Sequence, residues 1–388
     1  MNPPPRRGRK RGNGEGTITR RADGRYTAAI FVIRPDGTRG HKWVYGVTRA
    51  EVARKLVDLT QRVNAGVVMP TRSPTVGEYL DYWLAEVATP RLRPTTIAKY
   101  RTAIERYLRP ALGTQKLDQL TVATVQRFLN TRRAAGDSVQ KLRWIREVLS
   151  SALGRAQREE LVMRNVTQLT TLPTEQRRRR LAWTAEQSRR FLDAARGDAA
   201  HPVFVLALLY GLRRGEIAAL CWSDIDTERG IIDVQASLAR AGGKLVLGPT
   251  KSQAGVRTLP IVDLAREVLD EQRARQQQQR AAAGDGWIDT GFVFTTRTGR
   301  PIDPHNLSRS FDRIVAAAGL PPIVFHDLRR TAATLLKDLG VPARDAQVIL
   351  GHSHVSVTLG IYSEVFDSQI NTALHRMNTA LKGPTLGR

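Results

Sequence analysis

Residues 325–331 of this 388-residue chain read Phe-His-Asp-Leu-Arg-Arg-Thr. His326 and Arg329 are three positions apart, a spacing that places both on one face of a helix. A guanidinium group can donate two parallel hydrogen bonds to the non-bridging oxygens of a phosphodiester. The stretch therefore predicts a helix that presents a histidine and an arginine to one phosphate group.

Similar residue types recur on both sides of this stretch. Residues 210–216 read Tyr-Gly-Leu-Arg-Arg-Gly-Glu, and residues 350–354 read Leu-Gly-His-Ser-His. The complete set of candidate catalytic residues comprises Arg213, Lys251, His326, Arg329, His352 and Tyr362. Because a phenol in a phosphate-binding pocket can act as a nucleophile, the set indicates DNA cleavage through a covalent protein–phosphate intermediate.

The charge of the chain supports a nucleic-acid partner. Its 61 lysines and arginines outnumber its 36 aspartates and glutamates, which gives a formal net charge of +25. Such an excess favours a polyanion. A GC-rich genome would explain a preference for arginine over lysine, but it would not explain the imbalance.

The sequence also argues against several other classes of protein. Cys221 is the only cysteine, which excludes an intramolecular disulfide and a zinc cluster of cysteines and fits a reducing cytoplasm. No apolar stretch reaches the roughly 18 residues that span a bilayer, and the basic N-terminus lacks the apolar core of a secretory signal. There is no nucleotide-binding Gly-x-x-x-x-Gly-Lys-Ser/Thr loop and no convincing metal-ligand cluster. We therefore expect a cytoplasmic protein that needs no cofactor and has no membrane partner.

The N-terminal part of the chain predicts a basic arm followed by a small domain. Residues 1–14 are rich in proline, glycine and arginine, which is typical of a flexible arm. Within residues 15–66, strand-forming runs alternate with two Asp-Gly turns and precede a helix at 50–63. This pattern predicts a three-stranded β-sheet with one helix.

The rest of the chain predicts a mainly helical, multidomain protein. Residues 74–170 carry apolar residues at helical spacing in four segments, and residues 171–180 form a basic linker. Residues 181–388 make the last block, in which helical segments are mixed with short strands. Residues 367–382 predict a final amphipathic helix.

Basic residues in the arm, the sheet, the helical block and the linker are candidates for DNA binding. A β-sheet can lie in a major groove, although a solvated charged face is the alternative. Four consecutive arginines in the linker favour an extended segment that crosses a DNA backbone, and a solvated loop is compatible with this. The predicted DNA-binding residues are Arg6, Arg7, Arg9, Lys10, Arg11, Arg25, Arg93, Lys99, Lys141, Arg177, Arg178, Arg179 and Arg180.

Taken in order, these motifs resemble those of the tyrosine recombinases, particularly the integrases of phages and integrative elements. The resemblance covers nearly the whole chain and is strongest over residues 181–366. It implies an N-terminal module for arm-type DNA sites, a helical core-binding domain and a mixed α+β catalytic domain. It also implies that the final helix docks on a neighbouring subunit, with packing on its own domain as the alternative.

The resemblance assigns the arginines to phosphate binding. Arg213, the first of the pair at 213–214, and Arg329 would hold the non-bridging oxygens. Arg214 would point elsewhere, because neighbours on a helix face different ways. Glu216 matches the family's acidic residue and would orient the basic groups, which hardly differs from a structural salt bridge.

The resemblance assigns the general acid to a lysine. Residues 250–261 predict a β-hairpin with a turn at 253–255. The family's lysine precedes this turn, so Lys251 would protonate the leaving 5′ oxygen. Lys244 is the competing candidate, because the register of a hairpin is hard to fix from sequence.

The remaining roles are those of the histidines and the tyrosine. His326 would transfer a proton or bind the phosphate, His352 would donate a hydrogen bond to it, and Tyr362 would form a 3′-phosphotyrosine. His354 is not at a catalytic position of the family. Gly360 departs from the polar residue that is usual beside the nucleophile, and glycine there would loosen the tyrosine helix.

The function implied is that of a site-specific recombinase that integrates and excises a mobile element of bacteria. Its implied partners are double-stranded DNA with core-type and arm-type attachment sites, three further copies in a tetramer, a host DNA-bending protein and an excisionase, and its implied location is the nucleoid. Relaxation of DNA, as by a type IB topoisomerase, is one alternative, and the separate N-terminal module argues against it. A non-catalytic DNA-binding regulator is the other, and the complete set of six residues argues against that. Phage, plasmid and conjugative-element origins look alike at this level.

Overall fold

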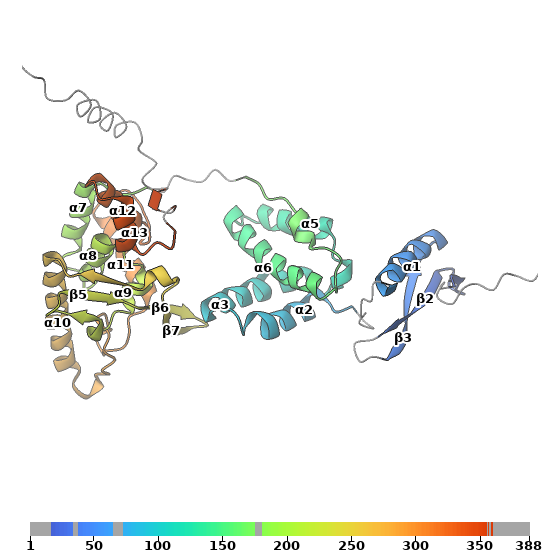
Figure 1. Ribbon diagram of the computed structural model, residues 1–388, viewed down its shortest axis with the longest axis horizontal. Helices are drawn as coiled ribbons and strands as arrows, with labels where there is room; N and C mark the ends of the chain where they lie inside the picture. Colours follow the sequence, from blue (N-terminus) through green and yellow to red (C-terminus); the bar gives the residue numbers. More distant parts are fainter. Residues whose placement is uncertain are drawn as a thin grey trace, which may run out of the picture. The chain divides into compact units, whose positions relative to one another are not determined.

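The structure is a computed structural model that describes residues 17–33, 38–64, 73–174 and 181–354, together with residues 356, 358 and 359. The chain forms two compact units, Met1–Gln176 and Arg177–Arg388 (Figure 1). Several predictions fall outside the described residues. They concern the basic arm, the arginines of the linker at 177–180, Gly360, Tyr362 and the final helix at 367–382.

The N-terminal part of the first unit is an antiparallel sheet with a helix on one face. Strands β1 (Thr19–Arg20), β2 (Tyr26–Ile33) and β3 (Arg39–Gly46) pair in chain order, and α1 (Arg49–Asn64) follows them. Alternate side chains of β2, among them Ile30, pack with one side of α1 into a small apolar cluster. The predicted three-stranded sheet with one helix is confirmed.

The second part of the first unit is a helical bundle with its own apolar core. The side chain of Thr75 accepts from the backbone of Glu78 and the side chain of Glu78 accepts from that of Thr75, so the first helix starts where two backbone N–H groups are capped. Each π-helical turn continues the α-helix before it without a break. In order, the α- and π-helical elements are α2 (Val76–Tyr82), the π-helical turn Trp83–Ala88, α3 (Pro94–Ala103), the π-helical turn Ile104–Leu108, α4 (Arg109–Leu112), α5 (Val122–Ala134) and α6 (Val139–Arg158).

The second unit is built around the apolar helix α8 (His201–Tyr210), which is buried along almost its whole length. Four fully buried aromatic side chains meet in its core, those of Trp183, Phe191, Phe204 and Phe311. The other helices are α7 (Ala185–Ala195), α9 (Arg214–Ala218), α10 (Asp263–Ala283), α11 (Pro304–Ala317), α12 (Asp327–Asp338) and α13 (Ala343–Leu350). Within the described ranges, no helix is both long and apolar enough to cross a membrane.

In the described residues of this unit, five short strands form two separate antiparallel sheets. One sheet has the order β4 (Ile225–Asp226), β5 (Ile231–Val234), β8 (Arg257–Pro260), and the other pairs β6 (Ala236–Ala241) with β7 (Lys244–Pro249). The predicted mainly α fold, with a mixed α+β second unit, is confirmed.

The hairpin predicted over residues 250–261 is wrong. A 3₁₀ turn does lie at Gln253–Gly255, but β7 before it pairs with β6, and β8 after it pairs with β5. The reason is that β7 finds a nearer partner across the tight turn at Gly242 and Gly243, which both have positive φ. The turn therefore links two sheets, and Lys251 lies in the connection between them.

Candidate active site

The first arginine of the site is fixed by a sharp turn after α8. Gly211 ends that helix with a φ of +59°, and a Cβ atom there would lie 2.3 Å from a side-chain carbon of Leu350. Arg213 then caps the N-terminus of α9. Its backbone N–H donates to Oε2 of Glu216 (3.1 Å), and its Nη1 donates to Oε1 of the same carboxylate (2.5 Å). Glu216 is only 1% exposed, so a buried carboxylate holds the partly exposed side chain of Arg213.

A second arginine reaches the same carboxylate from β8. Nη2 of Arg257 lies 3.2 Å from Oε2 of Glu216, and this guanidinium is almost completely buried. Arg257 is not among the site residues predicted from the sequence. The pattern that could have identified it is the alternating burial along β8, in which Arg257 and Leu259 are buried while Thr258 and Pro260 are exposed. An arginine that shares the inner face of a strand with a core leucine needs an internal anionic partner.

The third arginine comes from α12. Arg329 is 5% exposed, and it donates from Nη1 to the carbonyl of Gly211 (2.8 Å) and from Nε to Nε2 of His352 (3.1 Å). Its Nη2 atom is buried and has no hydrogen-bond partner among the residues that the structure describes. Burial, followed by the positive charge of Arg213, lowers the pKa of Arg329 to about 9. Both observations mark a place where an anion would be stabilised.

His352 lies just beyond α13, where Gly351 has a φ of +66°. Its Nδ1 is 2.8 Å from the hydroxyl of the buried Thr358, while Nε2 faces Nε of Arg329. Because Nε of Arg329 can only donate, Nε2 must accept, and the ring proton must lie on Nδ1. Burial, and then the charges of Arg329 and Arg213, lower the pKa of His352 to about 4, so the ring is neutral at pH 7.

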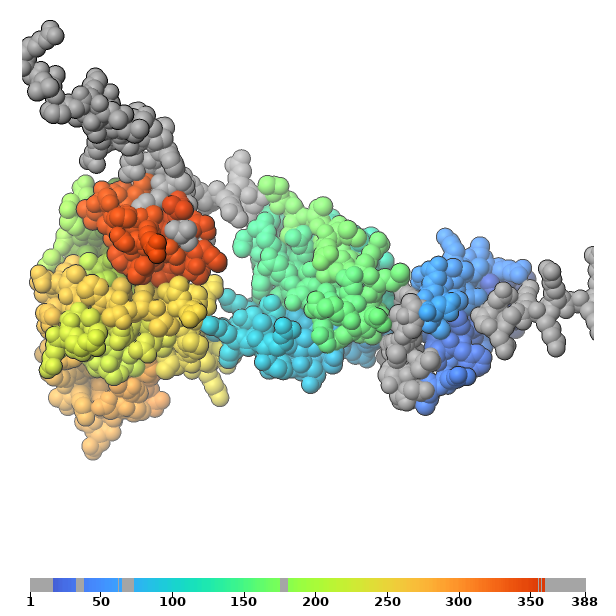
Figure 2. Space-filling model, viewed as in Figure 1, coloured from blue at the N-terminus to red at the C-terminus, as the bar shows by residue number. Residues whose placement is uncertain are grey.

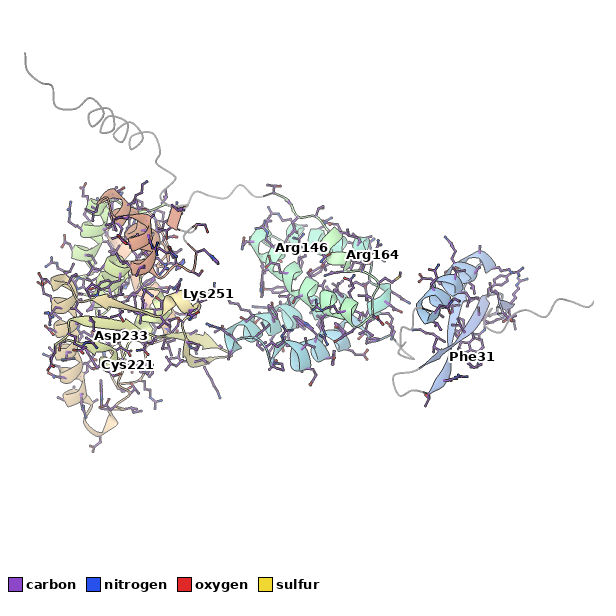
Figure 3. The ribbon with its side chains drawn as sticks, viewed as in Figure 1. Phe31, Arg146, Arg164, Cys221, Asp233 and Lys251 are labelled. Atoms are coloured by element: carbon purple, nitrogen blue, oxygen red, sulfur yellow. The ribbon has the colours of Figure 1, made fainter. Side chains whose placement is uncertain are left out.

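The structure thus brings together Arg213, Arg329 and His352 of the predicted set, and Glu216 pairs with the first of them. His326 is exposed at the N-terminus of α12, close enough for its charge to lower the pKa of His352. Lys251 is exposed in the connection between the two sheets (Figure 3). In the space-filling view, α12 and α13 form a continuous orange-red surface beside the yellow strands (Figure 2).

Two alternatives from the sequence have clear positions. Arg214 points away from Glu216 and donates from Nη1 to the hydroxyl of Ser308 on α11. Lys244 is exposed at the start of β7, opposite Ala241 in the β6–β7 ladder. His354 is exposed, and Tyr362 is not among the described residues.

The predicted DNA-binding residues of the first unit differ in their surroundings. Arg25, Arg93 and Lys99 are exposed. Lys141 is instead held by Asp137, with 2.6 Å between Nζ and Oδ1, and it lies over the ring of Tyr107. Because the charge of Lys141 is already paired with Asp137, this side chain would attract a phosphate less strongly than an unpaired lysine would. Lys141 is therefore the weakest of these candidates.

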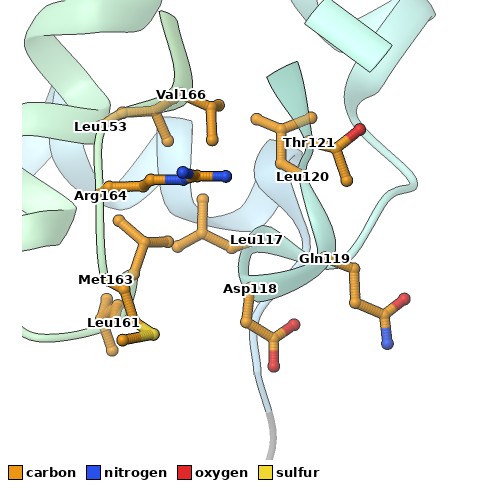
Figure 4. Close-up of a pocket in the computed structure, with 11 residues that line it drawn as sticks. Leu117, Asp118, Gln119, Leu120, Thr121, Leu153, Leu161, Met163, Arg164 and Val166 are labelled. Atoms are coloured by element: carbon orange, nitrogen blue, oxygen red, sulfur yellow. The ribbon is translucent and has the colours of Figure 1, made fainter. Parts of the chain in front are cut away.

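A cavity of about 260 Å³ lies in the helical part of the first unit (Figure 4). Most of its lining is apolar, from Leu117, Leu153, Leu161 and neighbouring residues, with Asp118 and Arg164 as its charged groups. It lacks the cluster of cations seen around Glu216. The candidate active site is therefore the arginine cluster of the second unit.

Comparisons with known proteins agree with this assignment. Residues 182–369 match the phage integrase family, and residues 75–131 match the N-terminal SAM-like domain of phage integrases. An integrase of Streptomyces ambofaciens is 30% identical over 90% of this chain and 92% of its own length. The chain belongs to the phage integrase family. It is accordingly a DNA strand-transferring enzyme of the tyrosine recombinase type, and it acts in site-specific recombination and the integration of mobile elements.

Other relatives of this integrase extend the likeness. A XerC-like tyrosine recombinase of Caldanaerobacter subterraneus is 28% identical over 91% of this chain and 95% of its own length. Among solved structures, the Tn1549 transposon integrase in complex with transposon right-end DNA has a TM-score of 0.67 and 20% identity, covering 79% of this chain and all of that one. A lambda integrase dimer bound to a core site has a TM-score of 0.57 and 20% identity over 92% of this chain and 98% of that one. At such identities, the two structures show a shared fold.

Proposed function

We propose that this integrase cleaves DNA by attack of Tyr362 on a phosphodiester that is held between Arg213 and Arg329. One observation carries the proposal, namely that Nη2 of Arg329 is buried without a partner in the described residues. A buried guanidinium nitrogen without an acceptor is costly, and a non-bridging phosphate oxygen would satisfy both its hydrogen bond and its charge. Three guanidinium groups around the single carboxylate of Glu216 leave an excess of positive charge for that oxygen.

The proposed chemistry needs only residues of the chain. The phenolic oxygen of Tyr362 forms a bond to phosphorus while the bond to the 5′ oxygen breaks, which leaves a 3′-phosphotyrosine. Arg213 and Arg329 stabilise the charge that develops on the non-bridging oxygens. His326 takes the proton that the phenol of Tyr362 loses, and Lys251, on its exposed loop, gives a proton to the leaving 5′ oxygen. Attack by a 5′ hydroxyl of the partner strand reverses the step and joins the new strands.

His352 has a more specific part in this proposal. Since its Nε2 accepts from Nε of Arg329, the imidazole fixes the plane of the guanidinium that binds the phosphate. Its Nδ1–H donates to Thr358, only four positions before Tyr362. His352 thereby connects the phosphate clamp with the segment that leads to the nucleophile.

We propose that the N-terminal sheet binds arm-type DNA through its outer face. Phe31 and Trp43 are 63% and 54% exposed there, and the ring of His41 lies between theirs, 4.1 Å from Phe31 and 6.2 Å from Trp43. Arg21 lies over the ring of the neighbouring Tyr45, at 5.7 Å. Apolar side chains can contact thymine methyl groups in the major groove, while arginines at the edge reach phosphates.

The assembly and partners belong to the same proposal. The integrase would act as a tetramer on core-type sites, with a host DNA-bending protein and an excisionase setting the direction of recombination at the nucleoid. The basic arm and the linker arginines would follow the DNA backbone. The lambda integrase, a relative in fold, has been solved as a tetramer bound to a Holliday junction. A tetramer of this chain on two joined duplexes would be the equivalent state.

A plasmid assay separates this function from DNA relaxation. Duplexes are first selected from a random pool by affinity for the full-length Tyr362→Phe chain, and two selected sites are placed on one supercoiled plasmid. We expect the wild-type chain to give recombined products that depend on both sites, and Tyr362→Phe to give none while binding equally well. Relaxation that is independent of the sites, without recombination, would instead assign a topoisomerase-like activity.

A further inference from the structure

We infer that Arg257 is a positioning residue for DNA cleavage. Its guanidinium would fix the relative positions of the three segments that carry Arg213, Lys251 and His352. The inference rests on the proposed function and adds a residue to it. Arg257 would touch neither the phosphate nor the nucleophile, because it is buried and each of its three nitrogens already donates a hydrogen bond inside the protein. It would act through the groups that do.

Each nitrogen of this guanidinium reaches a different segment, namely α9, the turn after Lys251 and the end of α13. Nη2 lies 3.2 Å from Oε2 of Glu216, the carboxylate that holds Arg213. Nη1 donates to the carbonyl of Gly255 (2.9 Å), and Nε donates to the carbonyl of Ile349 (2.9 Å). A planar fork with donors in fixed directions can make all three bonds at once, whereas an ammonium group could not reproduce that geometry.

The two carbonyls belong to segments that lead to the other candidate catalytic residues. Gly255 closes the 3₁₀ turn that follows Lys251, with its N–H bonded to the carbonyl of Ser252 (2.9 Å). Ile349 lies in the last turn of α13, three positions before His352. A shift of Arg257 would therefore move the lysine loop (residues 250–256) and the histidine loop (residues 351–354) together.

Close packing leaves these loops little freedom to adjust. A Cβ atom on Gly351 would lie 2.7 Å from the carbonyl oxygen of Ala254 and 2.9 Å from Nη1 of Arg257. The carbonyl of Gly351 also accepts from Nη2 of Arg213 at 3.3 Å. The lysine loop, the histidine loop and the first arginine thus meet around one guanidinium that is 4% exposed.

The charge of Arg257 acts on the same groups as its geometry. The pKa of His352 is lowered by burial and by the positive charges of Arg329, Arg213, Arg257 and His326, which come from α12, the start of α9 and β8. Removing the Arg257 charge would raise that pKa. His352 would then become protonated at a higher pH, and its Nε2 could no longer accept from Arg329.

The test compares Arg257→Lys with Arg257→Met in the full-length chain. The readout is the single-turnover rate of covalent capture on a nicked suicide duplex at saturating protein, across pH, with DNA affinity and thermal unfolding measured in parallel. Arg313→Met is the matched control, because that arginine pairs with Asp198 on another side of the unit. We expect Arg257→Lys to slow capture by about 10²-fold while DNA affinity changes by less than threefold, since a misplaced catalytic group costs this much.

The pH profile separates positioning from stability. Arg257→Lys keeps the charge, so the acid limb of its profile should stay where it is in the wild type. Arg257→Met should move that limb to higher pH as well as slow capture. If Arg257→Lys does not fold, Gly351→Ala disturbs the same meeting point and should slow capture in the same way.

Two results would overturn the inference. One is that the wild-type chain is captured covalently on the suicide duplex and folded Arg257→Lys is captured at the same rate. That result would leave the proposed function intact. The other is that the capture rate of the variants falls only in proportion to the fraction of folded protein, while the acid limb of the pH profile of Arg257→Met stays where it is in the wild type. No capture by the wild-type chain on any selected duplex would instead overturn the proposed function, and this inference with it.

Discussion

Two carboxylates in this integrase are each held by two basic side chains, and they differ in what lies around them. Glu216 in the second unit pairs with Arg213 and Arg257, and Asp137 in the first unit pairs with Arg132 and Lys141. The side chains of Arg132 and Lys141 are about one-third exposed, at 31% and 33%, whereas Arg257 is buried. Basic residues alone therefore do not distinguish a ligand site from a structural cluster.

The two clusters differ in the further cation that lies beside the first of them. Beside Glu216, Arg329 is buried and its Nη2 has no acceptor in the described part of the chain. Around Asp137, Arg132 and Lys141 share the carboxylate and both lie over the ring of Tyr107. The buried Arg329 donor without an acceptor marks the first cluster as a place for an anion, whereas the cations of the second are paired and partly exposed to solvent, which marks it as structural.

The largest expected effect is that of Arg329→Ala. Removing the guanidinium removes the charge and the donor that the proposed phosphate needs in the transition state. We expect cleavage to slow by about 10³–10⁵-fold, the range for arginines that stabilise transferring phosphoryl groups. Single-turnover capture on a suicide duplex measures this, and Arg132→Ala serves as the control. A loss of less than tenfold would place the anion elsewhere.

Glu216→Gln should mainly affect stability. It leaves Arg213 and Arg257 facing a neutral amide in a buried site, and breaking such a pair costs about 3–5 kcal/mol. Denaturant unfolding of the full-length chain measures the change in the free energy of unfolding of the second unit. An unchanged midpoint would show that the two arginines do not depend on this carboxylate.

Thr358→Val tests the link between His352 and the segment before Tyr362. Valine keeps the volume of the buried side chain and removes the acceptor for Nδ1–H of His352, which costs about 1 kcal/mol. The ring can then carry its proton on Nε2, where it opposes Nε of Arg329. We expect capture to slow about fivefold, and Thr358→Ser, which keeps the hydroxyl, should retain most of the rate. Equal losses in the two variants would argue against the hydrogen bond.

Asp137→Asn should have the smallest effect. Hydrogen bonds from Lys141 and Arg132 outweigh burial and lower the pKa of Asp137. A carboxyl whose pKa is lowered by folding adds stability above its unfolded pKa and loses it as the pH falls through the folded value. With partly exposed partners, the loss at pH 7 should be about 1 kcal/mol or less, with no change in capture rate. A strong loss of capture would show that this cluster takes part in catalysis.

The sequence predicted those parts of the site that depend on local spacing. His326 and Arg329 stand three apart at the start of a helix, and the glycine before His352 ends another, so their places follow from short motifs. The family resemblance assigned the catalytic role to Arg213 rather than Arg214, and the Arg214 side chain donates to Ser308.

What the sequence did not predict depends on pairing between distant segments. The strand after Lys251 joins β5 rather than β7, and nothing within residues 250–261 specifies that choice. The role of Arg257 follows from this pairing, because only in β8 does its side chain reach both Glu216 and Ile349. The contact of Lys141 with Asp137 was also missed, although the two are four apart across the start of α6.

Cleavage of a neutral scissile phosphate would show whether Arg329 acts by balancing the charge of the phosphate. A suicide duplex is made with a methylphosphonate at the cleavage position, which replaces one charged non-bridging oxygen by a methyl group. If Arg329 acts by balancing that charge, the wild type should cleave the phosphodiester far faster than Arg329→Ala does, and the difference should largely disappear on the methylphosphonate. An equally large difference between the wild type and Arg329→Ala on both substrates would show that Arg329 does not act by balancing that charge.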